Sequence, residues 1–205
     1  MPHDAQPTGS DLPPLPEVPN LAARRCEGLP EVIVVTPKRF GDGRGFFSET
    51  YHRDKFAQVG IDCEFVQDNH SLSAAVGTLR GLHYQLPPHA QDKLVRVVRG
   101  RIRDVAVDIR RSSPTFGKHV AVELSAEGGE QILVPKGFAH GFVTLEPDTE
   151  VVYKVSDVYD QPSERGIAWN DPQLAVDWGL PVDQPTLSGK DAQNPKLADQ
   201  PDLFA

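Results

Sequence analysis

The sequence is poor in cysteine, in net positive charge and in long apolar runs, and each shortage excludes a class of protein. Its 205 residues include only two cysteines, Cys26 and Cys63, too few for a disulfide framework, so we expect a reduced, cytoplasmic chain. The formal net charge of -8 gives no overall field to attract nucleic acid or an anionic membrane. No apolar run approaches the ~18 residues of a membrane span, and no basic-then-apolar N-terminus indicates a signal peptide.

Apolar residues are also scarce at both ends of the chain. Prolines stand at positions 2, 7, 13, 14, 16 and 19, and so many prolines exclude a helix there. We expect residues 1–25 to form a flexible leader, residues 26–194 a single domain, and residues 195–205 a C-terminal tail that frays near Gln200. Regular structure is expected to begin with the β-branched run at residues 31–35.

The middle of the chain consists of short apolar runs separated by Gly, Pro, Ser or Asp turns. After the run at 31–35, the expected strands cover residues 46–51, 64–69, 78–85, 93–99, 102–109, 119–124, 131–134, 141–145 and 151–156. The one convincing helix before the main run of strands covers residues 54–59 and stops at Gly60. Many short strands without a helical period predict an all-β fold, an antiparallel sandwich or jelly roll.

Two histidines lie in contexts typical of metal-binding jelly rolls of the cupin type. Gly77 and His83 have the spacing of the first metal-binding motif, and His140 keeps the histidine of the second. The second histidine position holds Gln85, however, and the position of the acidic ligand holds Lys93. Two imidazoles beside an ammonium bind a divalent metal poorly. We therefore expect a cupin-like jelly-roll β-barrel, with a few short helices, that has kept the pocket and lost the metal.

The same residues can perform acid/base chemistry. His83 can serve as a general base, because an imidazole has an unperturbed pKa of about 6.5. Lys93 opens a run in which alternate residues share one face, so its ammonium can stabilise a developing enolate as a metal would. Tyr153 lies in a similar run at residues 151–155. If its face is the lumen, its hydroxyl can donate a proton from the side opposite His83.

Each of these residues also has a plainer interpretation. A lone strand histidine is more often hydrogen-bonded within the fold, a strand-end lysine is as often solvated, and such a tyrosine is more often core. Further candidates for holding an anion, a base or a sugar, each equally open to a structural interpretation, are Arg44, Arg80, Arg165, Lys190, Glu49, Gln67, Asn69 and Glu164.

Eight stretches, spaced in order along the chain, carry a resemblance to a known family. They cover residues 40–47, 66–71, 79–83, 105–110, 113–117, 135–142, 169–172 and 187–191. Together they resemble the dTDP-4-dehydrorhamnose 3,5-epimerases of deoxysugar biosynthesis, over a span from about Val32 to Asp191. The chain departs from the typical member in its leader of about 25 residues, whose role the resemblance does not explain.

The resemblance implies a jelly-roll homodimer that uses no cofactor and no metal. His83 matches the family's base, Tyr153 its acid, and Asp191 the carboxylate that orients the base. Lys93 matches the lysine near the keto oxygen of the sugar. The positions that match substrate-binding residues are Arg44, Glu49, Gln67, Asn69, Arg80, His140, Glu164 and Lys190. In the family, some of these reach across from the partner subunit.

The implied reaction inverts C3 and C5 of dTDP-4-dehydro-6-deoxy-D-glucose and gives dTDP-4-dehydro-L-rhamnose. Alternatives stay open: a mono-epimerase for C3 or C5 alone in an antibiotic deoxysugar pathway, a ketoisomerase on the same fold, or a non-catalytic nucleotide-sugar binding module. Binding alone requires no acid/base set, so His83, Lys93, Tyr153 and Asp191 together disfavour the last. A metal-dependent oxygenase of the cupin type is disfavoured by Gln85 and Lys93.

Overall fold

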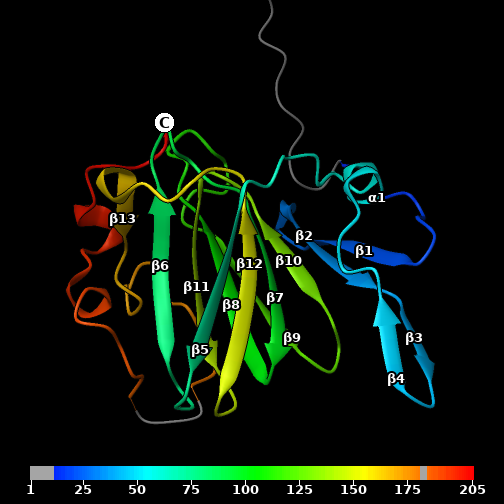
Figure 1. Ribbon diagram of the computed structural model, residues 1–205. Helices are drawn as coiled ribbons and strands as arrows, with labels where there is room; N and C mark the ends of the chain where they lie inside the picture. The colour runs from blue at the N-terminus through cyan, green and yellow to red at the C-terminus, as the bar shows by residue number, and fades with distance from the viewer. Residues whose placement is uncertain (1–11, 181–183) are drawn as a thin grey trace, which may run out of the picture.

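The computed structural model describes residues 12–180 and 184–205, and Figure 1 shows two antiparallel sheets packed face to face. The larger sheet has the order β1 (Leu21–Cys26), β2 (Leu29–Pro37), β10 (Gln131–Val134), β7 (Lys93–Arg99), β12 (Thr149–Val155) and β5 (Gln67–Ser73). The smaller sheet has the order β13 (Glu164–Gly166), β6 (Leu79–Gln85), β11 (Phe138–Thr144), β8 (Arg101–Asp108) and β9 (His119–Ser125). A separate hairpin consists of β3 (Arg39–Asp42) and β4 (Gly45–Ser48).

The all-β, antiparallel jelly-roll prediction is confirmed, with one difference in how the fold closes. Apart from the β3–β4 hairpin, the strand pairs within the described residues form two sheets with free edges, not one ring of hydrogen bonds. The two sheets are held together by side chains between them, which is the double-sheet form of a jelly roll. The expected continuous barrel is therefore a sandwich, and part of the space between its sheets remains open.

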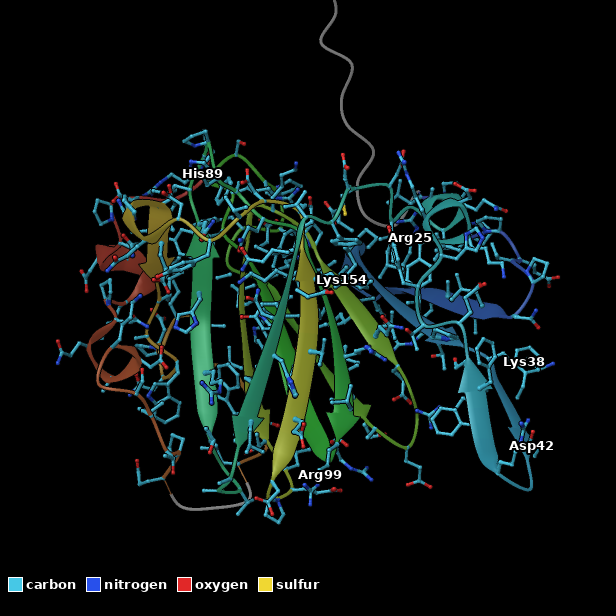
Figure 2. All side chains as sticks on the ribbon, viewed as in Figure 1. Arg25, Lys38, Asp42, His89, Arg99 and Lys154 are labelled. Carbon is cyan, nitrogen blue, oxygen red and sulfur yellow. The ribbon has the colours of Figure 1, made fainter. Side chains whose placement is uncertain are left out.

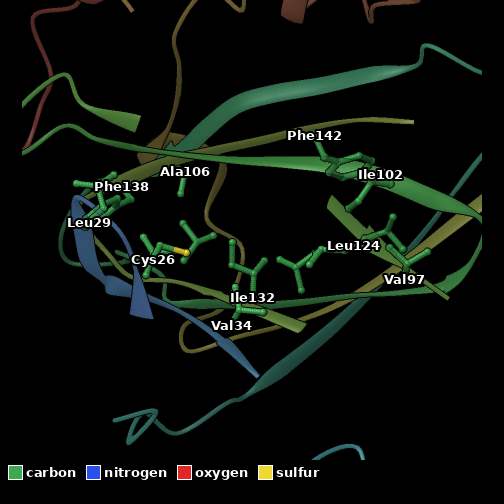
Figure 3. Packing of buried hydrophobic residues seen from close by; sticks show 14 residues of the cluster. Cys26, Leu29, Val34, Val97, Ile102, Ala106, Leu124, Ile132, Phe138 and Phe142 are labelled. Atoms are coloured by element: carbon green, nitrogen blue, oxygen red, sulfur yellow. The ribbon is translucent and has the colours of Figure 1, made fainter. Parts of the chain in front are cut away.

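The filled part of that space is an apolar cluster contributed by both sheets. Alternate residues of β2, β7 and β8 point into it, as Figure 3 shows for Val34, Val97, Ile102 and Ala106. This alternation follows from the pleat of a strand, which places every second side chain on the same face. The space between the sheets is thus closed by packing over most of the large sheet, and the remaining part lies beside β5 and β6.

The helices are short, and the predicted one is present. Helix α1 (Arg53–Gln58) buries Phe56 against Ile33 and Val35 of β2, close to the predicted bounds of 54–59. The remaining helical turns are η1 (Gln161–Ser163), η2 (Asp191–Gln193) and η3 (Leu197–Asp199). Across residues 12–180 and 184–205, none of the helices has the length and apolarity to cross a membrane.

The expected start of regular structure is wrong. Strand β1 begins at Leu21 and pairs with β2, ten residues before the predicted first strand at 31. Val18 and Leu21 are buried against Ile33 of β2. The strand was not predicted, because Ala-Ala-Arg-Arg has little β-propensity of its own. Its hydrogen bonds to β2 stabilise the extended conformation. Residues 1–11 of the expected leader lie outside the described part of the chain.

The expected frayed tail is also wrong. Gln200 is only 5% exposed, and its side-chain amide donates to the backbone oxygen of Gly166 at 2.8 Å. The Tyr84 hydroxyl donates to the backbone oxygen of Asp202 at 2.5 Å, and Leu197 joins the apolar cluster on the outer face of the small sheet. The C-terminal segment therefore covers the back of β6, because that face is apolar and would otherwise meet water.

Candidate active site

The open part of the space between the sheets is a cavity of about 260 Å³. It is lined by Ser71, Arg80, His83, Lys93, His140, Phe142, Tyr153, Ser188, Lys190 and Asp191. A second lobe of about 120 Å³ shares His83, Lys93 and Tyr153 with the first. Gln67, Asn69 and Glu164 also line this second lobe. Ten of the twelve site residues expected from the sequence thus lie around one cavity.

Two of these residues come from the large sheet by simple alternation. Lys93 shares a face with Val95 and Val97, which point into the apolar cluster between the sheets. Tyr153 packs against that same cluster from β12, where it pairs with Val95. The predicted faces of both strands are therefore confirmed, and the ammonium and the phenol stand on the wall opposite β6.

His83 and Arg80 reach the cavity through a break in the alternation of β6. The register shifts here, because Arg80 pairs with Phe142 while His83 pairs with His140. Three steps on β6 thus face two steps on β11, which is a β-bulge and turns both side chains toward the same face. Gly81 makes the break possible, since its φ is +128° and an added Cβ would lie 2.5 Å from Cα of Gly141.

The imidazole of His83 is held by a carboxylate. Its Nε2 lies 2.5 Å from Oδ1 of Asp191, and Oδ2 of Asp191 accepts a hydrogen bond from the Ser188 hydroxyl at 2.9 Å. Burial raises the pKa of Asp191, but hydrogen bonds from His83, Ser188 and the Gly81 backbone outweigh it, so the pKa lies below its usual value. Asp191 is therefore an anion that fixes the ring of His83 and leaves the other ring nitrogen free.

The second histidine has a similar partner, which the sequence did not reveal. His140 Nε2 lies 2.8 Å from Oδ2 of Asp104, and both residues are buried. The other carboxylate oxygen, Oδ1, has no hydrogen-bond partner among the described atoms. Asp104 was detectable in principle, because it shares a strand face with the apolar Ile102 and Ala106, where a carboxylate needs a partner. Ser188 was not predicted as a partner of Asp191, because it lies in a turn, where no strand or helix periodicity indicates the direction of a side chain.

The cation in the cavity is shifted toward its neutral form. Burial lowers the pKa of Lys93 to about 8, against the opposing attraction of Asp104 and Glu164. The Lys93 ammonium donates to the backbone oxygen of His83 at 3.3 Å. Burial also raises the pKa of Tyr153, so its phenol stays protonated at neutral pH. The cavity thus contains a cation, a phenolic proton donor and a carboxylate-bound imidazole.

The second lobe has a polar wall linked by hydrogen bonds. Tyr159 donates its backbone N–H to Oε1 of Gln67 at 3.0 Å and its hydroxyl to Oε2 of Glu164 at 2.8 Å. Gln67 in turn donates to Oδ1 of Asn69 at 2.8 Å, and Glu164 forms an ion pair with Lys190. Burial raises the pKa of Glu164, but the bonds from Lys190 and Tyr159 outweigh it and lower the pKa overall.

Two expected site residues lie away from this cavity. The Arg44 side chain is 91% exposed and pairs with Asp42 at the end of the β3–β4 hairpin, and Glu49 pairs with Lys55. Figure 2 shows Asp42 at the far side of the molecule from β6. Arg165, also considered as an anion ligand, donates to Asp202 instead. The geometry of one chain therefore does not bring Arg44 or Glu49 to the cavity.

The donor set of the cavity does not suit a metal. His83 and His140 each direct Nε2 at a carboxylate, and Lys93 adds a cation. Over the described ranges, no three His, Cys, Asp or Glu side chains are grouped so as to hold a metal ion. The absence of a metal stays a prediction. Larger depressions line the N-terminal segment and the region of Cys63, but none contains either histidine–carboxylate pair.

The chain is similar in sequence to named enzymes over most of its length. The family model described as dTDP-4-dehydrorhamnose 3,5-epimerase matches residues 27–199. The dTDP-4-dehydrorhamnose 3,5-epimerase of Shigella flexneri is 54% identical over 172 residues, which cover 83% of this chain and 93% of that protein. A dTDP-4-dehydrorhamnose 3-epimerase of Streptomyces niveus is 36% identical over 176 residues, 85% of this chain and 84% of that protein.

Solved structures give the same result. The dTDP-6-deoxy-D-glucose-3,5-epimerase of Legionella pneumophila Philadelphia 1, solved in complex with dTDP-4-keto-L-rhamnose, superimposes with a TM-score of 0.82 and 46% identity. The match covers 87% of this chain and 93% of that one. Together with the cavity between the sheets, these likenesses establish that the chain belongs to the dTDP-4-dehydrorhamnose 3,5-epimerase family.

Proposed function

We propose that this protein is the epimerase that inverts C3 and C5 of dTDP-4-dehydro-6-deoxy-D-glucose, with His83 as base and Tyr153 as acid. The observation that carries the proposal is the placement of these two groups. His83 comes from β6 of the small sheet and Tyr153 from β12 of the large sheet, and both line one cavity. A base and an acid on opposite walls can act on opposite faces of a sugar ring held between them.

The first step is removal of the proton at C5. The C4 ketone makes this hydrogen acidic, because the electrons of the C–H bond move into an enolate whose charge lies on oxygen. The free ring nitrogen of His83 takes the proton, and Asp191 stabilises the resulting imidazolium. The Lys93 ammonium meets the enolate oxygen, a stabilisation realised only as charge develops.

The second step returns a proton to the other face. The Tyr153 hydroxyl gives its proton to C5 as the enolate electrons form the new C–H bond, and the ketone is restored. His83 loses its proton to water, and the phenolate takes one back, so the site is ready for C3. The same sequence there completes the double inversion and consumes no cofactor.

The remaining polar residues of the cavity hold the substrate. Arg80 and Lys190 supply positive charge near the first lobe, in a chain that is otherwise acidic, and so suit a diphosphate. Gln67, Asn69, Glu164 and His140 offer hydrogen bonds to the base and the sugar. Binding energy from the nucleotide positions the ring, which is remote from it, between the two acid/base groups.

We also infer a homodimer in which the β3–β4 hairpin completes the partner's cavity. Arg44 is extended into solvent on this hairpin, beside three exposed aromatic rings, Phe40, Phe46 and Phe47. Such exposed rings mark an interaction surface, and in a two-fold dimer each hairpin reaches its neighbour reciprocally. Arg44 and Glu49 then act on the substrate bound to the partner. Both cysteines are free, which suits the cytoplasmic location proposed for the chain.

The test is incubation with dTDP-4-keto-6-deoxyglucose in heavy water, followed by NMR of the product. A 3,5-epimerase incorporates deuterium at C3 and C5 and inverts both centres. A mono-epimerase, the second candidate because one relative carries the name 3-epimerase, inverts one centre only. Binding without exchange would indicate a non-catalytic module and contradict the proposal.

The proposed role of His83 as the base is tested with a variant of that residue. His83→Asn should lower the exchange rate at both carbons by about 10²–10⁴-fold, the usual contribution of a general base, while the thermal unfolding midpoint stays near that of the wild type. Exchange at the wild-type rate would remove His83 from this role.

A further inference from the structure

Gln85 is a buried amide that the proposed reaction does not use. It follows His83 by two residues on β6, at the position where metal-binding jelly rolls place a second histidine, and it is only 4% exposed. A buried amide is costly unless its donors and acceptor are all satisfied. The partners of Gln85 therefore indicate what this side chain does.

All three partners are backbone groups in two loops above the end of β6. Oε1 of Gln85 accepts from the N–H of Asp160 at 3.0 Å, and Nε2 donates to the oxygen of Val158 at 3.2 Å. The second Nε2 hydrogen goes to the oxygen of His89 at 2.7 Å. Val158 and Asp160 are the neighbours of Tyr159 in the chain, so Gln85 binds the loop on both sides of that residue.

Tyr159 is where this loop meets the second lobe of the cavity. Tyr159 is 55% exposed and belongs to none of the three apolar clusters formed by the described residues, so packing does not fix its position. Its backbone N–H and its hydroxyl nevertheless bond to Gln67 and Glu164, which line the lobe, and Glu164 is paired with Lys190. Gln67 and Glu164 lie on strands β5 and β13, so the part of this polar wall that depends on the loop is Tyr159.

Apart from these two bonds of Tyr159, the other side-chain contacts from outside the loop are at its beginning. Gln91 donates to the backbone oxygen of Asp157 at 2.8 Å, and His89 Nδ1 lies 3.3 Å from the Asp157 carboxylate. Asp160 binds forward to Ser163 in the turn that follows. Of the side-chain bonds found in the described ranges, those of Gln85 alone fix Val158 and Asp160 to the sheet that carries His83.

We propose that Gln85 is a positioning residue for nucleotide binding: it holds the 158–160 loop so that Tyr159 and Glu164 form the wall of the second lobe. The inference rests on the proposed function, because that lobe is assigned to the nucleotide-sugar. The position at which metal-binding jelly rolls place a second histidine thus links, in this chain, the strand of His83 with the wall of the second lobe.

The test uses Gln85→Met, which keeps the length of the side chain and removes all three hydrogen bonds. We expect the Kd for dTDP, measured by calorimetry, and the KM for the keto sugar to rise about tenfold. We expect kcat and its pH profile to stay unchanged, because His83, Lys93 and Tyr153 are not touched. A normal Kd and KM, or a fall in kcat alone, would overturn the proposal.

A double-mutant cycle distinguishes positioning from general destabilisation. Tyr159→Ala removes the phenol that the loop held by Gln85 presents to the second lobe, so adding Gln85→Met to it should raise the Kd no further. Additive effects would show that Gln85 acts by another route. If Gln85→Met does not fold, Gln85→Glu retains the acceptor for Asp160, and an unchanged Kd in that variant equally contradicts the inference.

The matched control is Thr144→Val at the opposite end of the small sheet. Its hydroxyl accepts from the Thr78 N–H and donates to the Ala75 oxygen, both at 3.0 Å, so it is also a buried clasp on a loop. This variant should lose stability and keep its Kd for dTDP. Because dTDP binding needs no turnover, a wild-type chain that binds dTDP and does not epimerise would refute the proposed function and leave the Gln85 test intact.

Discussion

Lys93 places an ammonium between two sheets whose facing side chains are mostly apolar. Its pKa is lowered to about 8, first by burial, from the value of 10.5 for a free lysine. The unfolded chain therefore holds this proton more tightly than the folded one. Below pH 8 the folded state bears the whole cost of the buried charge, between pH 8 and 10.5 stability rises as the proton leaves, and above 10.5 the cost is gone.

Lys93→Met should accordingly stabilise the fold while it impairs catalysis. Because the side chain is partly open to the cavity, we expect a gain on the order of 1 kcal/mol below pH 8. The gain should shrink as the pH rises from 8 toward 10.5, where wild-type Lys93 is neutral as well. Urea unfolding at several pH values measures it. A gain that is independent of pH would show that the ammonium is not the destabilising group.

Tyr153→Phe should separate loss of a proton from its return. His83 still exchanges the substrate hydrogen with solvent, so deuterium should enter C5 with the original configuration. Formation of the inverted product should fall by about 10²–10⁴-fold, the contribution of a general acid. NMR in heavy water reads both quantities from one sample. Inversion at the normal rate would exclude the phenol as the acid.

Individual site residues were predictable to the extent that strand alternation governs them. Lys93 and Tyr153 lie where period two places them, and the resemblance supplied Asp191, which no local pattern indicates. Asp104 was not predicted as a site residue, because it contacts His140 on a neighbouring strand and the two residues are 36 positions apart in the sequence. Arg44 shows the opposite limit: the resemblance predicts that it binds substrate, and in the single chain its side chain is exposed to solvent.

At the scale of elements, the bulge in β6 decides what the cavity contains. Gly81→Ala should be strongly destabilising, because its φ is +128° and the new Cβ would meet the Cα of Gly141 at 2.5 Å and the oxygen of His140 at 2.7 Å. We expect a loss of about 2–4 kcal/mol, measured by urea unfolding.

The control for this change is Gly43→Ala in the β3–β4 turn. An added Cβ there has no atom within 4 Å, and the residue has no left-handed φ. Its stability should stay within about 0.5 kcal/mol of the wild type. Equal losses in the two variants would mean that glycine itself, and not the close approach of β6 and β11, matters.

Strand bounds were predictable where the local sequence alone determines them. The bounds of β7 and β10 agree with the prediction to the residue, since both are β-branched runs between clear turns. The bulge was not predictable, because it depends on how β6 pairs with β11. Strand β1 was missed for the same reason, since its pairing with β2 overrides a sequence of weak propensity.

At the scale of the whole molecule, the proposed dimer predicts complementation between two inactive variants. Arg44→Ala chains keep their base but supply no arginine to the partner, whereas His83→Asn chains do the reverse. In a mixed dimer one cavity has both residues. Random re-association of equal amounts should restore about a quarter of wild-type activity, since half the dimers are mixed and each has one complete cavity.

The assay is epimerase activity after co-refolding, with each variant refolded alone as the baseline. Size-exclusion chromatography with light scattering reports the assembly. Activity that never exceeds the average of the two variants would show that Arg44 serves its own chain or none, and a monomer in solution would refute the shared site directly.

The carboxylate that holds the imidazole of His83 comes late in the chain. Asp191 follows every strand of both sheets, from β1 to β13, and the segment that covers the back of β6 follows it. During synthesis a ribosome therefore releases the complete sandwich before it releases Asp191. A nascent chain can assemble both sheets, but the cavity is complete, and the imidazole of His83 has a fixed orientation, only when the segment with Ser188, Lys190 and Asp191 has emerged and docked.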